Sequence, residues 1–290
     1  MGKRAVKFLI KLLLSLLALY LLFKRVDFKS VGEVIRGSNF YFLFFAFVFF
    51  NLSKIVSSVR LNLFFKALGI KLSEIEALKL YYIGMFYNLF LPGGIGGDGY
   101  KIYLLKRANL SGVKELVQAT VLDRLSGVTP LFIFAGIFFL FSHFRSIFGW
   151  FIYLDILGVV LALPTLWLIY RYLFKRFYKT FLSTTALGFL TQLLQLILAI
   201  FIAKALFIDN FLADVLVIFL VSNIVAVLPV SVGGVGLREW VFLYGFSLLN
   251  LPVEKGVAFG VIFFLITAIS SFFGLFLKHN LEDKTIKTPN

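Results

Sequence analysis

Apolar residues in this chain gather in uninterrupted blocks, several of them near the roughly 20 residues that a helix needs to cross the hydrocarbon core of a bilayer. Continuous blocks indicate membrane helices, whereas an outer-membrane barrel would show alternating apolar and polar residues. Of the 290 residues, 61% are hydrophobic and only 15% are charged, a balance outside the range of soluble domains. The sequence therefore predicts an all-α integral membrane protein, with a single polytopic membrane domain over residues 1–290.

Six apolar blocks are long enough to form transmembrane helices. They cover residues 6–23, 40–59, 115–141, 150–170, 183–207 and 256–277. Two further apolar segments, 75–107 and 215–249, are each interrupted by a motif rich in proline and glycine. We expect these two segments to be re-entrant hairpins, because irregular backbone at membrane depth is tolerated only where protein or a water-filled cavity surrounds it.

The two interrupting motifs are related copies of one pattern. Residues 91–101 read LPGGIGGDGYK, and residues 228–238 read LPVSVGGVGLR. The shared positions are a proline, a Gly-Gly pair, a later glycine and a cation at matched offsets: Pro92, Gly96, Gly97, Gly99 and Lys101 in the first copy, and Pro229, Gly233, Gly234, Gly236 and Arg238 in the second. Paired Pro/Gly-broken segments in corresponding positions of two halves indicate a transporter's binding site.

Lysine and arginine are concentrated in the segments that a six-span arrangement places in the cytoplasm, as the positive-inside rule requires. Both termini are then cytoplasmic, and the two re-entrant hairpins enter the inner (plasma) membrane from opposite sides. Repeat 1 (about 1–145) and repeat 2 (about 146–280) form an inverted-topology repeat, with a short polar tail at 278–290. The basic loop at 24–39 departs from the rule. Two full crossings in place of the hairpins would give eight spans.

Charge and composition exclude several classes of function. The net charge of +15 is explained by cytoplasmic loops that face anionic lipid headgroups, so we expect no nucleic-acid partner. The chain has no cysteine and only two histidines, which argues against a metal site. No catalytic motif is recognisable, and the G-x-G-x-x-G pattern at 94–99 lacks the strand and βαβ unit of a dinucleotide site. We expect no cofactor and no enzyme activity.

The motif residues have the chemistry of an anion site. Proline ends the incoming helix, and glycines permit positive φ and close backbone approach. A new helix that starts near Gly99 or Gly236 leaves its first N–H groups and its positive dipole end available to an anion. Lys101 and Arg238, in the first turn of that helix, add full charges. The pattern predicts a phosphate-bearing headgroup as the ligand, while the competing interpretation is two ordinary loops.

Three ionisable residues elsewhere in the apolar segments are further candidates, since such residues are rare in membrane helices. Arg60 is predicted to contribute a cation to the site. Arg124 is predicted to face the same cavity as another cation, with Asp123 accepting from a further donor. The alternative for Arg124 and Asp123 is a structural pairing with a neighbouring helix. As adjacent residues, they point to different helix faces and are not expected to pair with each other.

Two acidic residues are predicted to support the motif cations. Glu239 follows Arg238 and is expected to orient it or to accept a proton, and Asp98 is given the same role beside Lys101. Lys54 and Lys204 lie nearer to the ends of the predicted spans. We therefore expect these two lysines to extend to the membrane interface.

The two motifs, residues 60–69 (RLNLFFKALG) and residues 123–127 (DRLSG), resemble the flippase-like family that shares the transmembrane region of lysylphosphatidylglycerol synthases. In bifunctional members this region moves aminoacylated phosphatidylglycerol between leaflets and a separate soluble domain makes it, whereas some stand-alone members are linked to polyprenyl-phosphate lipids. The resemblance implies a membrane domain without the soluble synthase domain.

From this resemblance we expect translocation of a lipid with an anionic phosphate headgroup, such as an aminoacylated phosphatidylglycerol or a polyprenyl-phosphate-linked lipid, across the inner membrane. A separate lipid-modifying enzyme is a candidate partner. Two alternatives remain open. One is a membrane-embedded lipid-modifying enzyme in which Asp98 or Glu239 is catalytic. The other is a scaffold for a separate lipid synthase that transports nothing itself.

Overall fold

The computed structural model describes residues 27–90, 96–227 and 236–277, and every regular element in these ranges is a helix. Five helical segments are long and apolar enough to cross a membrane: Phe40–Ala67, Val113–Phe141, Gly149–Leu173, Lys175–Ala205 and Val253–Phe276. They confirm membrane-length helices at five of the six predicted spans. The predicted span at 6–23 lies outside the described residues, so the count of six stays a prediction.

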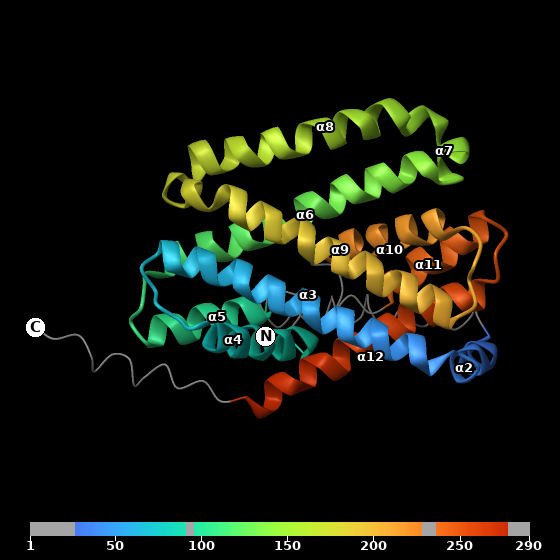
Figure 1. Cartoon of the computed structure of the whole chain (residues 1–290), viewed down its shortest axis with the longest axis horizontal. Coiled ribbons are helices and arrows are strands. Elements are labelled where there is room, and N and C mark those ends of the chain that lie inside the picture. Colours follow the sequence, from blue (N-terminus) through green and yellow to red (C-terminus); the bar gives the residue numbers. More distant parts are fainter. Residues whose placement is uncertain (1–26, 91–95, 228–235, 278–290) are drawn as a thin grey trace, which may run out of the picture.

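Figure 1 shows the helices of the described ranges coloured in chain order. They are α2 (Phe28–Arg36), α3 (Phe40–Ala67), α4 (Glu74–Phe90), α5 (Gly96–Arg107), α6 (Val113–Phe141), α7 (Phe144–Ile147), η2 (Gly149–Phe151), α8 (Ile152–Leu168), η3 (Ile169–Leu173), η4 (Lys175–Thr180), α9 (Phe181–Ala205), α10 (Leu212–Val227), α11 (Leu237–Leu248) and α12 (Val253–Phe276). The long helices lie side by side as a bundle, and α8 lies at its edge.

Helix α3 is longer than the sequence indicates. Its first turn is capped by Asn39, whose Oδ1 accepts a hydrogen bond from Tyr41 N at 3.0 Å. The predicted span ended at residue 59, before a basic stretch. The helix instead continues to Ala67, because Arg60 and Asn62 are buried against other helices and do not face water. The extra turns place Arg60 inside the bundle, while Lys66 stays exposed.

Each predicted hairpin is a pair of short helices in contact. α4 packs against α5, and α10 packs against α11. α4 and α10 have 17 and 16 residues, or about 25 Å of helix, which is less than the thickness of a bilayer core. In Figure 1 the first pair lies at the left end of the bundle and the second at the right end. The re-entrant position of the pairs stays a prediction.

The two pairs end in the same way. Asn109 follows α5 with φ 49°, and Asn250 follows α11 with φ 54°. In both places the N–H of the next residue donates to a carbonyl five residues earlier, at 3.2 and 2.9 Å, as in a Schellman cap. α3 and α9 end on matching caps too, around Gly69 and Phe207. The likeness between the halves therefore extends beyond the motif.

Packing crosses between the halves in a reciprocal manner. α4 packs against α12, and α10 packs against α6, so each motif pair contacts the last long helix of the other half. α3 and α9, which hold corresponding places in the two halves, form the most extensive helix contact. This arrangement brings polar residues from both halves to the middle of the bundle.

Candidate functional site

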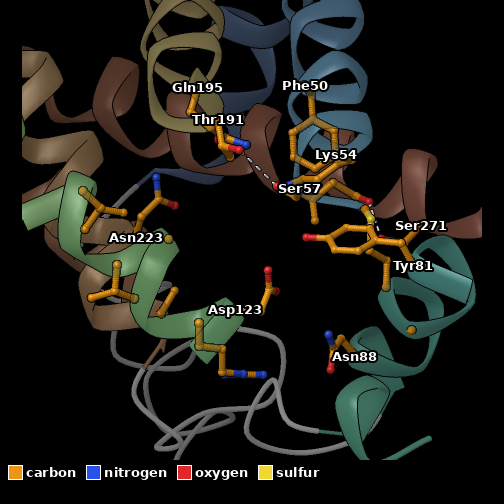
Figure 2. Close-up of a pocket in the computed structure, with 18 of the residues that line it drawn as sticks. Phe50, Lys54, Ser57, Tyr81, Asn88, Asp123, Thr191, Gln195, Asn223 and Ser271 are labelled. Atoms are coloured by element: carbon orange, nitrogen blue, oxygen red, sulfur yellow. Dashed lines mark hydrogen bonds between the residues drawn. The ribbon is translucent and has the colours of Figure 1, made fainter. Parts of the chain in front are cut away.

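A cavity of about 350 Å³ lies in the middle of the bundle. Its lining comes from α3, α4, α5, α6 and α9 to α12, and Figure 2 shows Lys54, Ser57, Tyr81, Asp123 and Asn223 around the open space. Charged and amide side chains are costly inside a bundle of membrane-spanning helices and are kept where they have a function or a partner. The cavity is therefore the candidate site.

Two ion-pair clusters occupy one side of the cavity. Asp98 on α5 accepts from Lys101 Nζ through Oδ1 at 2.7 Å and from Arg124 Nε through Oδ2 at 2.5 Å. Asp123 on α6 accepts from Arg60 Nε on α3 at 2.8 Å. Carboxylates thus position three cations from three different helices.

Two glycines make room for these cations. The aliphatic stem of Lys101 lies over Gly84 of α4, where an added Cβ would come within 3.1 Å of it. The guanidinium group of Arg60 lies in the same way over Gly127 of α6, with Nη1 at 3.0 Å from such a Cβ. A larger residue at either position would push a charged side chain out of its place.

Two more cations line the cavity without a carboxylate. Lys54 Nζ lies 4.5 Å from the ring centroid of Phe50, and the guanidinium carbon of Arg238 lies 4.8 Å from that of Phe263. Neither cation forms an ion pair with another described residue. Cation–π contacts of this kind stabilise a charge by about 0.5–2 kcal/mol, less than a carboxylate would in the same place.

Three buried polar atoms on cavity-lining residues have no hydrogen-bond partner among the described residues. They are Arg60 Nη1, Arg238 Nε and Gln192 Oε1. A buried donor without an acceptor costs about 1–3 kcal/mol, so such groups usually belong to a site that a ligand or water completes. Two of the three are guanidinium donors, which suit an anionic acceptor.

Neutral polar residues join the helices around the cavity. Gln195 Nε2 on α9 donates to Ser53 Oγ on α3 at 2.8 Å. Gln192 Nε2 donates to the carbonyl of Gly127 on α6 at 3.1 Å. These bonds fix the position of α9 relative to the two helices that carry Arg60 and Asp123.

The site has the composition of an anion-binding site. Among the residues described, no group of three or more His, Asp or Glu is arranged to hold a metal ion. Arginine side chains bind phosphate through two N–H groups, and lysine adds a point charge. The cavity is therefore suited to a phosphate group.

A comparison of the sequence with known protein families gives a match over residues 8–274, to the family described as the lysylphosphatidylglycerol synthase TM region. The chain belongs to this family. Membership of the lysylphosphatidylglycerol synthase transmembrane family confirms the resemblance carried by the motifs. It supports a multi-pass membrane protein connected with lipids.

One curated relative is the UPF0104 membrane protein PH1989 of Pyrococcus horikoshii, which is 30% identical over 112 residues. That match covers 38% of this chain and only about a third (33%) of the relative. No solved structure matches the chain. The relative's name gives a membrane location and no activity.

The cavity brings together most of the site residues that were predicted from the sequence and that the structure describes. Six of them line it: Arg60, Asp98, Lys101, Asp123, Arg124 and Arg238. Asp123 and Arg124 make separate ion pairs, as expected for neighbours on a helix. Pro92, Pro229, Gly233 and Gly234 lie outside the described residues.

The predicted backbone geometry of the first motif is wrong. Gly96, Gly97 and Gly99 are already helical, because α5 begins at Gly96. Lys101 is therefore in the second turn and not the first. Gly97 N donates to Asn88 Oδ1 at 2.8 Å and is not available to a ligand. A Cβ on Gly97 would overlap the carbonyl of Gly84, so this glycine serves close packing of α4 and α5.

In the second motif the start of the helix agrees better with the prediction, but the role of Glu239 differs from it. α11 begins at Leu237 after Gly236, whose φ of 84° favours glycine, and Arg238 is in the first turn. Gly236 N, however, donates to Glu239 Oε2 at 2.8 Å. Glu239 therefore caps the helix and forms no ion pair with Arg238 among the described residues. The exposed N–H groups expected at both Gly-Gly turns are not seen at Gly97 or Gly236.

Sequence reasoning missed Lys54. Because α3 extends to Ala67, Lys54 lies in the middle of the helix and lines the cavity rather than reaching the membrane interface. A signal was present: polar residues recur three or four positions apart within α3, at Asn51, Lys54, Ser57 and Ser58. Such spacing marks one face of a helix, and that face points inward.

Proposed function

We propose that this protein moves a lipid with an anionic phosphate headgroup between the two leaflets of the plasma membrane. The observation that carries the proposal is the buried, cation-rich cavity, which is lined from both motif pairs by Asp98, Lys101 and Arg238. Membership of the lysylphosphatidylglycerol synthase transmembrane family supports the proposal. The headgroup would pass through the cavity while the hydrocarbon chains stay in the membrane.

The arrangement of the halves supports an alternating-access mechanism. The two motif pairs lie at opposite ends of the bundle in Figure 1, and each packs on the last long helix of the other half. We infer an inverted repeat with re-entrant pairs and both termini in the cytoplasm, in which rocking of the halves opens the cavity to each side in turn. No ATP-binding motif occurs in this chain, so movement would be passive, ion-coupled or driven by a partner.

Translocation can be measured with the purified protein in liposomes that contain tail-labelled phosphatidylglycerol or phosphatidic acid. Quenching of the label in the outer leaflet reports movement between leaflets. We expect faster movement than in protein-free liposomes for at least one of these lipids. We also expect Arg238→Gln to slow it about tenfold or more, the effect of losing a charge-assisted hydrogen bond.

Lys204→Gln is the matched control, because Lys204 is exposed and outside the cavity. It should leave the rate unchanged. Equal rates with and without protein for every phosphate lipid would refute translocation, and a chemically altered lipid in the same liposomes would favour the enzyme alternative. If the protein moves no lipid in liposomes, and cells that carry Arg238→Gln still make the lipid product of the separate synthase, the scaffold alternative would be favoured.

A further inference from the structure

The charges that line the cavity do not balance. Five cations and two carboxylates line it: Lys54, Arg60, Lys101, Arg124, Arg238, Asp98 and Asp123. The carboxylates pair with three of the cations, which leaves Lys54 and Arg238 without an ion-pair partner among the described residues. The formal excess is three positive charges.

Lys54 and Arg238 lie over neighbouring aromatic rings. The rings beneath them, Phe50 and Phe263, are in edge contact with centroids 6.1 Å apart. Lys54 comes from α3 in the first half, and Arg238 comes from α11 in the second. The pair thus presents two cations to one part of the cavity, from the two halves of the molecule.

This pair needs an anion. Two like charges in a poorly solvated place repel each other, and Nε of Arg238 is buried without an acceptor. The motif segments 91–95 and 228–235 contain no ionisable residue that could supply a counter-charge. Glu239 follows Arg238, but it caps Gly236 and does not line the cavity. Even when Glu239 is included, the excess is two positive charges.

We propose that Lys54 and Arg238 form the phosphate subsite of the cavity. The lipid headgroup that binds there carries about two negative charges and no cationic group. A lipid phosphomonoester or diphosphate fits this description. A phosphomonoester carries about −1.5 to −2 charges near neutral pH, whereas a phosphodiester carries only one. A lysyl ester adds two ammonium groups and makes the headgroup cationic, so the excess positive charge disfavours it. This inference rests on lipid translocation as the function.

The substrate class can be tested with three lipids that share dioleoyl chains and differ in headgroup charge. They are phosphatidic acid, phosphatidylglycerol and lysylphosphatidylglycerol, each titrated onto the full-length protein in detergent and followed by native mass spectrometry. We expect phosphatidic acid to bind most tightly and lysylphosphatidylglycerol at least about tenfold more weakly. Equal or tighter binding of lysylphosphatidylglycerol would overturn the charge class.

The subsite itself can be tested with Lys54→Gln and phosphatidic acid. Binding should weaken about tenfold or more in this variant, as for loss of a charge-assisted hydrogen bond, and Lys54→Arg should restore most of it. Lys204→Gln is the matched control, because Lys204 also lies over a phenylalanine ring, 6.0 Å from Phe42, outside the cavity. Binding by folded Lys54→Gln equal to that of the control would overturn the subsite.

A further arm separates a lipid headgroup from a free phosphate. Inorganic phosphate should compete with phosphatidic acid only weakly, because the hydrocarbon chains add to the binding of the lipid. Competition at equal concentrations would assign the subsite to a soluble anion and overturn the lipid substrate. Binding that depends on Lys54, together with no movement in liposomes, would refute the proposed translocation while leaving the subsite intact.

Discussion

At the scale of single residues, the carboxylate of Asp98 holds two cations of the cavity. Its two oxygens accept from Lys101 and Arg124, and only 11% of its side chain is exposed. Removing one partner of a buried ion pair is far more destabilising than the pair is stabilising, because a charge is left in a place that water reaches poorly. Asp98 is therefore a structural requirement of the site as well as part of its lining.

Asp98→Asn should lower the free energy of unfolding by about 3 kcal/mol, since two cations lose their counter-charge together. Denaturant titration of the purified protein in detergent measures this. The double variant Asp98→Asn/Lys101→Met should recover part of the loss by removing one of the uncompensated charges. Asp209→Asn, at an exposed position, should change stability by no more than about 0.5 kcal/mol. A single Asp98→Asn variant as stable as that control would contradict the proposed role.

At the scale of helices, Gly97 of the first motif serves packing rather than a turn. α5 begins at Gly96, so Gly97 and Gly99 share one helix and differ in what surrounds them. A methyl group on Gly97 would meet the backbone of Gly84 in α4, while one on Gly99 would enter open space. The close contact between α4 and α5 is what places Lys101 in the cavity.

Gly97→Ala and Gly99→Ala form a matched pair that tests this close contact. Gly97→Ala should destabilise the protein by about 1–3 kcal/mol and slow lipid movement, because the two helices must separate. Gly99→Ala should be neutral or stabilising by up to about 1 kcal/mol, since alanine favours the helix. Thermal unfolding and the liposome assay measure both effects. Equal loss in the two variants would show that the motif needs glycine for backbone conformation after all.

At the scale of the whole molecule, α3 to α6 and α9 to α12 follow the same order in the two halves. α5 and α11 each have 12 residues and end on the same type of cap, and the motif pairs pack reciprocally on α12 and α6. An arrangement of this kind lets two equivalent rocking motions open one central cavity to opposite sides. Site-specific labelling in membrane vesicles tests the predicted inverted orientation.

The absence of native cysteine makes that measurement direct. Lys106 and Ser247 are exposed and each lies one residue before the end of its helix, α5 or α11. With a membrane-impermeant maleimide, Lys106→Cys should react only in inverted vesicles, and Ser247→Cys only in right-side-out vesicles. Reaction of both variants from the same side would refute the inverted repeat.

Much of the fold could be predicted because it depends on local properties of the chain. Apolar blocks of membrane length specify helices wherever the backbone must satisfy its own hydrogen bonds. Proline and glycine residues showed where the two apolar segments are interrupted. The described bounds of both helix pairs lie within a few residues of the predicted segments. The predicted end of α3 was wrong because Arg60 and Asn62 are buried by other helices.

The sequence by itself determined that this is a helical membrane protein with two related broken segments and cations beside them. The length and hydropathy of the apolar segments and the spacing of the motif residues are properties of the sequence alone. Only the tertiary structure decided how the charges divide. Asp98 and Asp123 form ion pairs with three cations, while Lys54, expected at the interface, and Arg238 line the cavity without an ion-pair partner among the described residues. Which cation meets which carboxylate depends on helices far apart in sequence, and no local pattern records that pairing.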